Sequence, residues 1–194
     1  MNNQKKINWR CQINEIAWLS TLFALVGATI ALRYMTGLPE AKWWQSLYIF
    51  VASSGVFFGG HFLLQALFVL PSMRLSIKIG RALAFGLTLI LLIALVTDTF
   101  VYQQYRFHIN WAMIDLAIVG GREVFSFSVT MINRIVLLIS CLGVLSLILV
   151  WVAVKLKINA VWACFVIVFS YLCVNLLNAC LLYTSPSPRD RSVS

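Results

Sequence analysis

The sequence predicts an all-α, polytopic membrane protein in which five transmembrane helices form a bundle. Of its 194 residues, 61% are hydrophobic and 11% are charged, whereas charged residues make up about one-quarter of a typical soluble domain. Five stretches are apolar over the roughly 20 residues that a helix needs to cross a membrane. Helices are expected because lipid offers the backbone no hydrogen-bond partners. The five spans are predicted at residues 13–32, 46–70, 82–102, 131–154 and 158–179.

Residues 1–12 are polar and basic, and they precede the first predicted span. The apolar run that follows has full membrane length, so it is expected to be a retained anchor rather than a cleaved signal peptide. The domain organisation predicted from the sequence is therefore a cytoplasmic N-terminus over 1–12, a transmembrane domain over 13–179 and a tail over 180–194.

The distribution of cations between the spans predicts the orientation of the chain. With the N-terminus in the cytoplasm, more cations fall on the cytoplasmic side than on the other side, as is usual for membrane proteins. Because the net charge of +9 is spread between the spans and not gathered on one face, no nucleic-acid partner is expected. The cytoplasmic cations are Lys5, Lys6, Arg10, Arg74, Lys78, Arg81, Lys155 and Lys157, and the others are Arg33, Lys42, Arg106, Arg122 and Arg134.

The second predicted span carries small residues and one histidine. Gly55 and Gly59 are four residues apart and Gly60 follows, a spacing that lets two helix backbones approach closely. This contact could be made within the bundle or with a helix of a partner protein, or the spacing could be due to chance. His61, near the middle of the span, is expected to hydrogen-bond to a neighbouring helix or to contact a headgroup or partner. Pro71 is expected to end the span.

The outer segment between the third and fourth spans, residues 102–130, is predicted to be amphipathic. Phe107, Trp111, Ile114 and Ile118 recur at helical spacing. Such a segment can lie in the plane of the membrane interface. Alternatively, it could form a short helix packed on the outer end of the bundle.

Few polar groups in the spans could support chemistry. Asp98 lies near the outer end of the third span, where it could pair with Arg106 or Arg134 or coordinate a lipid headgroup. Arginine forks suit phosphate, so four arginines on the outer side of the membrane or at its interface are candidate headgroup ligands. They are Arg33, Arg106, Arg122 and Arg134.

The sequence contains no recognisable enzyme motif within the five spans. It has no CxxC pair, phosphate loop, dinucleotide fingerprint or HExxH. His108 with one carboxylate does not make a catalytic set. No catalytic residue, metal or cofactor is therefore expected in this part of the chain. A small transporter or channel subunit would need a polar stripe, which is lacking apart from His61, Asn175 and Asn178.

Residues 180–190 match the translation of a transposon adapter used in sequencing libraries. They read Cys-Leu-Leu-Tyr-Thr-Ser-Pro-Ser-Pro-Arg-Asp. We therefore expect the tail to be non-native and the natural protein to continue beyond Ala179. The alternative is a natural tail rich in serine and proline.

The segment from Asp98 to Asn110 resembles a known family. It carries an aspartate near the end of the third span, an aromatic-rich stretch and a His-x-Asn, and in this it is similar to the N-terminal membrane domain of the YejM/PbgA family. These are Gram-negative inner-membrane proteins with a sulfatase-like periplasmic domain. The positions matching the motif or its surroundings are Arg33, Tyr34, Gly60, His61, Phe62, Pro71, Arg81, Asp98, Tyr102, Tyr105, His108 and Asn110.

The resemblance implies five helices in the bacterial inner membrane, with the N-terminus inside, followed by a periplasmic domain of the sulfatase and alkaline-phosphatase superfamily. Family members monitor lipopolysaccharide, bind acidic lipids such as cardiolipin, and control lipid A synthesis through other inner-membrane proteins. A divalent metal is expected only in that periplasmic domain, after residue 179. The helices would then supply anchoring, lipid contact and partner binding. Alternatively, they anchor a true periplasmic ester hydrolase or headgroup transferase.

Overall fold

The computed structural model is built of α-helices, and it describes residues 9–35, 43–112, 114–115, 119, 129–156 and 158–184. Four of the helices are long and apolar enough to cross a membrane, and a shorter apolar helix over Val161–Leu176 joins them. The predicted class, a multi-pass helical membrane protein, is confirmed. The elements are α1 (Trp9–Ala31), η1 (Leu32–Met35), α2 (Trp43–Leu64), η2 (Gln65–Val69), α3 (Leu70–Leu75), α4 (Ile77–Tyr105), α6 (Val129–Lys155) and α7 (Val161–Thr184).

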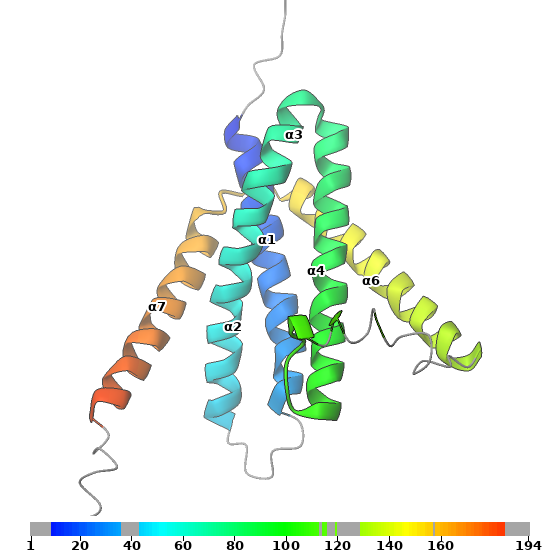
Figure 1. Cartoon of the computed structure of the whole chain (residues 1–194). Coiled ribbons are helices and arrows are strands. Elements are labelled where there is room, and N and C mark those ends of the chain that lie inside the picture. The colour runs from blue at the N-terminus through cyan, green and yellow to red at the C-terminus, as the bar shows by residue number, and fades with distance from the viewer. Residues whose placement is uncertain are drawn as a thin grey trace, which may run out of the picture.

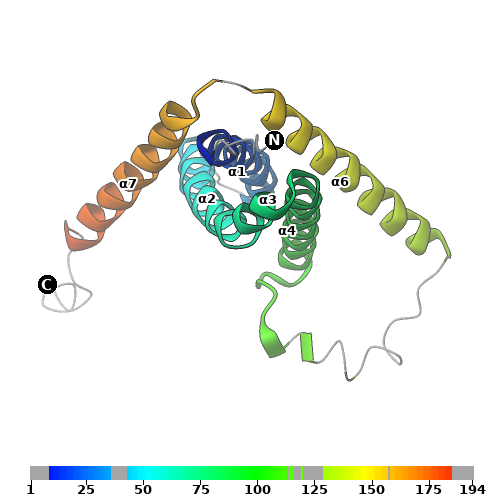
Figure 2. The same ribbon diagram turned by 90° about the horizontal axis from the view of Figure 1, so that it is seen from above.

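The central helix is α1. It packs against α2, α4, α6 and α7, while α6 and α7 flank the bundle and diverge from it (Figures 1 and 2). In the most apolar stretch of α1, 56% is buried, against 17% in α2. Small side chains on α1 permit this central position because they let neighbouring backbones approach. The buried small residues are Ala17, Ala24, Gly27, Ala28 and Ala31.

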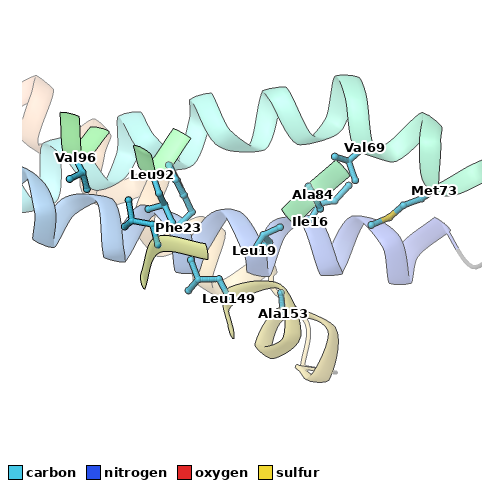
Figure 3. Packing of buried hydrophobic residues seen from close by; sticks show 11 residues of the cluster. Ile16, Leu19, Phe23, Val69, Met73, Ala84, Leu92, Val96, Leu149 and Ala153 are labelled. Atoms are coloured by element: carbon cyan, nitrogen blue, oxygen red, sulfur yellow. The ribbon is translucent and has the colours of Figure 1, made fainter. Parts of the chain in front are cut away.

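The apolar core runs along α1 and connects it to α4 and α6 (Figure 3). Lipid tails are as apolar as leucine, so this core is stabilised by close van der Waals packing more than by exclusion from water. Phe23 of α1 and Leu92 of α4 are almost completely buried. The cluster consists of Ile16, Leu19, Phe23, Val69, Met73, Ala84, Leu92, Val96, Leu142, Leu149 and Ala153.

The sequence predicts that Pro71 ends the second span. The structure shows that the helix continues beyond it. The helix continues through α3 to Leu75 because a wide π-helical turn precedes the proline, in which the N–H of Leu70 bonds to the carbonyl of Gln65. Pro71 then lies in the first turn of α3, where a missing N–H is tolerated. The chain turns instead at Ser76, whose backbone is extended.

The outer segment begins where α4 ends. Arg106 caps α4 in the left-handed conformation, with φ of 61°, and helical geometry reappears at residues 111–112, 114–115 and 119. Trp111 is 77% exposed and Val119 is 82% exposed. Exposed apolar side chains suit a segment lying in the membrane interface. Ile118 lies outside the described residues.

Of the three glycines in α2, one faces another helix. A Cβ added to Gly55 would collide with the side chain of Tyr171 in α7, whereas a Cβ added to Gly59 or Gly60 would meet nothing within 4 Å. The Gly55-x-x-x-Gly59 spacing therefore does not act as one paired contact within the bundle, and only its first member lies at a close approach.

Replacing Gly55 with valine is expected to lower the free energy of unfolding by about 1–3 kcal/mol, the usual cost of overpacking. The added methyl groups would force α7 away from α2 at Tyr171. The measurement is an unfolding titration in mixed micelles. Gly59→Val is the matched control, and an equal loss in both variants would contradict the assigned contact.

Candidate functional site

A polar cluster lies at the end of the bundle opposite the N-terminus, where η1 meets the last turns of α4. We call it the Asp98 cluster; its members are Tyr34, Asp98, Tyr102 and His108. Tyr34 comes from η1, Asp98 and Tyr102 from α4, and His108 from the segment that follows α4. Asp98 and Tyr102 share a face because residues four apart in a helix are neighbours.

Asp98 is the centre of this cluster because both of its carboxylate oxygens accept hydrogen bonds. The hydroxyl of Tyr34 donates to Oδ2 at 2.6 Å, and Nδ1 of His108 lies 2.7 Å from the same oxygen. The backbone N–H of Ile109 donates to Oδ1 at 2.7 Å. Hydrogen bonds to an ionised group are among the stronger ones in proteins. The carboxylate therefore ties the end of α1 and the segment after α4 to one point.

Aromatic rings close around the carboxylate. The His108 ring stacks on Tyr102 with a centroid distance of 4.8 Å, and Tyr34 meets the same two rings edge-on. The left-handed backbone of Arg106 makes this possible, because it reverses the chain after Tyr105 and returns His108 toward α4. A non-glycine residue in that conformation costs roughly 1–2 kcal/mol. The three bonds to Asp98 offset that cost.

Arg33 lies beside the Asp98 cluster. Its guanidinium donates to Oε1 of Gln103 at 3.2 Å and lies 4.7 Å from the centre of the Phe100 ring. The Gln103 amide donates in return to the carbonyl of Arg33 at 3.3 Å. This exchange joins η1 to α4 a second time. It holds a cation at the end of the bundle opposite the N-terminus.

The structure brings together only some of the residues predicted from the sequence. Asp98, Tyr102 and His108 meet, and among the described residues the Asp98 carboxylate contacts His108 rather than the expected arginine. The Tyr105 ring is exposed and lies against Phe107.

The remaining predicted positions are Asn110, Arg134 and Arg122. The carbonyl of Asn110 accepts from the N–H of Ile114 at 3.2 Å. Arg134 is exposed on the first part of α6, which diverges from α4 in Figure 2. Arg122 lies outside the described residues. Tyr34 is among the positions of the family resemblance but not among the predicted site residues; its position directly after the first span is the available signal.

A second polar cluster is buried at mid-span between α1, α2 and α4. We call it the His61 network; its members are Ser20, His61, Gln65 and Thr88, each at most 2% exposed. The predicted hydrogen bond from His61 to a neighbouring helix is present twice. Nδ1 lies 2.9 Å from the hydroxyl of Ser20 in α1, and Nε2 lies 3.1 Å from that of Thr88 in α4.

Gln65 extends the network below the imidazole. Gln65 Nε2 lies 3.2 Å from His61 Nε2 and 3.4 Å from the hydroxyl of Thr88. The Thr88 hydroxyl donates to the carbonyl of Ala84 at 2.7 Å. Phe23 stacks on the imidazole with a centroid distance of 4.3 Å. Among the described residues Gln65 Oε1 has no hydrogen-bond partner.

A third set of polar contacts fastens the turn between α6 and α7 to α1. The side chain of Asn14 donates to the carbonyl of Ile158 at 3.0 Å and accepts from the N–H of Ala160 at 2.7 Å. The indole of Trp18 also donates to Ile158, at 2.7 Å. One turn of α1 thus replaces the hydrogen bonds that the short connection cannot make internally.

Replacing Asn14 with alanine is expected to lower the free energy of unfolding by about 1–3 kcal/mol, because the N–H of Ala160 would lose its partner and the carbonyl of Ile158 would lose one of its two donors. An unfolding titration in mixed micelles measures it. The matched control is Asn175→Ala, since the amide of Asn175 bonds to the carbonyl of Tyr171 in its own helix. If both variants lost the same stability, the fastening role of Asn14 would be wrong.

The long apolar helices and the two polar clusters that join them define the class of this protein as a multi-pass helical membrane domain. Within the described part of the chain, no group of three or more His, Cys, Asp or Glu could hold a metal ion. The chain belongs to the family described as Domain of unknown function (DUF3413), whose model matches residues 2–183. No curated protein and no solved structure matches it.

Proposed function

We propose that this chain is the membrane-anchoring, lipid-contacting and partner-binding domain of a sulfatase-like protein of the bacterial inner membrane, involved in lipopolysaccharide and outer-membrane lipid homeostasis. The observation that carries the proposal is the Asp98 cluster. The Asp98, Tyr102 and His108 positions on which the resemblance to the YejM/PbgA family rests are the ones that bond or stack with one another. Membership in the DUF3413 family adds support.

The orientation follows from the charges at the two ends of the bundle. Five described cations lie at the N-terminal end, namely Arg10, Arg74, Lys78, Arg81 and Lys155. Cytoplasmic loops are enriched in cations, so this end faces the cytoplasm and the Asp98 cluster faces the periplasm. Any sulfatase-like domain, with its divalent metal and any ester-cleaving activity, would follow the fifth helix on the periplasmic side.

The periplasmic end would contact lipid phosphates through its arginines. Arg33 is held in place by Gln103 and Phe100, and Arg106 directly follows α4. Guanidinium groups bind phosphate through two parallel hydrogen bonds. The Asp98 cluster fixes the backbone next to these side chains. They would therefore bind acidic phospholipid or lipopolysaccharide with little loss of conformational entropy.

The partner-binding part of the proposal rests on the open face of α2. Gly59 and Gly60 have nothing within 4 Å of an added Cβ, and Val56 and Leu63 beside them are more than half exposed. Small residues on a lipid-facing surface allow a second helix to pack closely. A transmembrane helix of another inner-membrane protein would fit this face.

Neutralising the four outer arginines tests the lipid contact. In a variant with Arg33, Arg106, Arg122 and Arg134 all changed to glutamine, the affinity of this end of the chain for cardiolipin is expected to fall at least about tenfold, because each cation near an anionic surface contributes about 1 kcal/mol. Native mass spectrometry counts the retained lipid. The control neutralises Arg74, Lys78 and Lys155 at the other end. Unchanged retention in the outer variant would refute this contact.

The homeostasis role has its own test. Depleting the full-length protein in its source bacterium should change the ratio of lipopolysaccharide to phospholipid in the envelope. The ratio is measured by quantitative lipid analysis of whole cells, with re-expression of the intact gene as the control. A ratio that stays constant through depletion would exclude the proposed role while leaving the lipid contacts of the domain intact.

A further inference from the structure

A groove of about 1110 Å³ opens on the side of the bundle at its N-terminal end. Its lining comes from α1, α2 and α7 and from the end of α6. Figure 1 shows that α7 diverges from α1 and α2. The inner wall of the groove is apolar. The residues of this wall include Ala17, Phe58, Phe62, Cys164, Phe165 and Val168. The groove is slightly larger than the pockets that hold drug-sized ligands, which measure about 300–1,000 Å³.

The mouth of the groove is polar and carries a cation. Arg10 lines it and lies 5.8 Å from the centre of the Trp9 ring. Glu15 also lines it, but its carboxylate accepts two hydrogen bonds from Arg81, at 2.8 and 3.3 Å. Arg81 therefore neutralises the acid at the mouth, and Arg10 leaves a positive charge there.

The length of the groove matches one leaflet of a bilayer. Along α1 its lining extends from Trp9 to Ala17, which at 1.5 Å per residue is about 12 Å. The hydrocarbon core is about 30 Å thick, so one leaflet contributes about 15 Å. A partner helix that crosses the membrane would need a groove along the whole bundle. This groove ends near the midplane and suits an acyl chain instead.

We propose that the groove binds an anionic glycerophospholipid of the leaflet on the N-terminal side. Its acyl chain would lie against Phe58, Phe62 and Phe165, and its phosphate would meet Arg10, with the Trp9 indole at headgroup depth. This site is separate from the arginines of the periplasmic end. It also does not depend on the proposed orientation, because vesicles with the same lipid in both leaflets suffice to test it.

The experiment uses the full 194-residue chain in phosphatidylcholine vesicles. A trace of phosphatidylglycerol carrying a photoreactive acyl chain is added, or phosphatidylcholine carrying the same chain, and the labelled residues are mapped by mass spectrometry. On Cys164 and Phe165 the anionic lipid should label about fivefold more than the zwitterionic one, the factor expected for one cation near an anionic headgroup. On exposed Leu147 of α6 the two lipids should label equally.

Two variants with matched controls separate the headgroup from the chain. Arg10→Gln should abolish the fivefold preference, whereas Arg74→Gln, at the same end of the bundle, should keep it. Val168→Trp should reduce labelling of Cys164 by both lipids because it fills the groove, whereas Val144→Trp on the exposed face of α6 should not. Equal labelling by the two lipids in the unmodified chain, or a preference that survives Arg10→Gln, would overturn the proposal. So would the absence of label from the groove.

Discussion

Replacing His61 with alanine is expected to lower the free energy of unfolding by about 2–4 kcal/mol, among the largest effects of any single substitution in this chain. The imidazole fills a fully enclosed site and contacts three helices at once. Its removal leaves a cavity, and it removes hydrogen bonds that contribute about 0.6 kcal/mol each on average in membrane proteins. The cavity is therefore the larger contribution. Unfolding of the purified chain in mixed micelles measures the loss.

The matched control for His61 is its neighbour Gly60. Gly60→Ala adds one methyl group where nothing lies within 4 Å, so the free energy of unfolding should change by no more than about 0.5–1 kcal/mol, in the direction of greater stability. A His61→Ala variant as stable as Gly60→Ala would show that Ser20, Gln65 and Thr88 do not depend on the imidazole.

Asp98→Ala is the second substitution with a large expected effect. Tyr34, His108 and the N–H of Ile109 would lose their common acceptor. Each hydrogen bond to a charged group contributes roughly 1.5–3 kcal/mol, and the three are not additive, so a total loss of about 2–4 kcal/mol is expected. The change should be local, because the bonds close the outer end and not the core.

Hydrogen exchange at the Ile109 amide measures this local loss of stability, because that N–H donates to Asp98. Its rate should rise at least about tenfold, since every 1.4 kcal/mol of lost protection is a factor of ten. Asp98→Asn should give a smaller rise because one side-chain oxygen still accepts. The control is Asp115→Ala on the exposed outer segment. If exchange at Ile109 responded equally to both aspartates, the assigned bond to Asp98 would be wrong.

The spans were predictable because their signal is composition over a long window. Residues 82–102, for example, lie wholly within α4. The ends were less predictable because they depend on local geometry. A proline after an apolar run normally predicts a stop, and only the wide turn over Gln65–Val69 makes Pro71 compatible with a continuous helix.

The candidate site was predictable at the level of residue types but not of partners. An aspartate near a membrane interface was expected to take an arginine, since charge is what a sequence shows. The partners of Asp98 are instead Tyr34, which lies 64 residues earlier in the chain, and His108. The left-handed backbone of Arg106 brings His108 back toward α4. Neither a contact over that separation nor a positive φ at Arg106 leaves a pattern in a single sequence.

The wide turn over Gln65–Val69 also determines how far α3 is rotated about the helix axis. An α-helix rotates by about 100° per residue, and a π turn accommodates one additional residue, so α3 is turned by about that angle relative to α2. This rotation directs Met73 onto Gly80, where there is no room for a side chain. It also brings the carbonyl of Met73 within 3.4 Å of the side-chain amide of Gln12. Losing any one residue from 65–69 would place a different side chain over Gly80. The number of residues between His61 and Met73 therefore determines the rotation of α3 relative to α2 as well as the length of the helix.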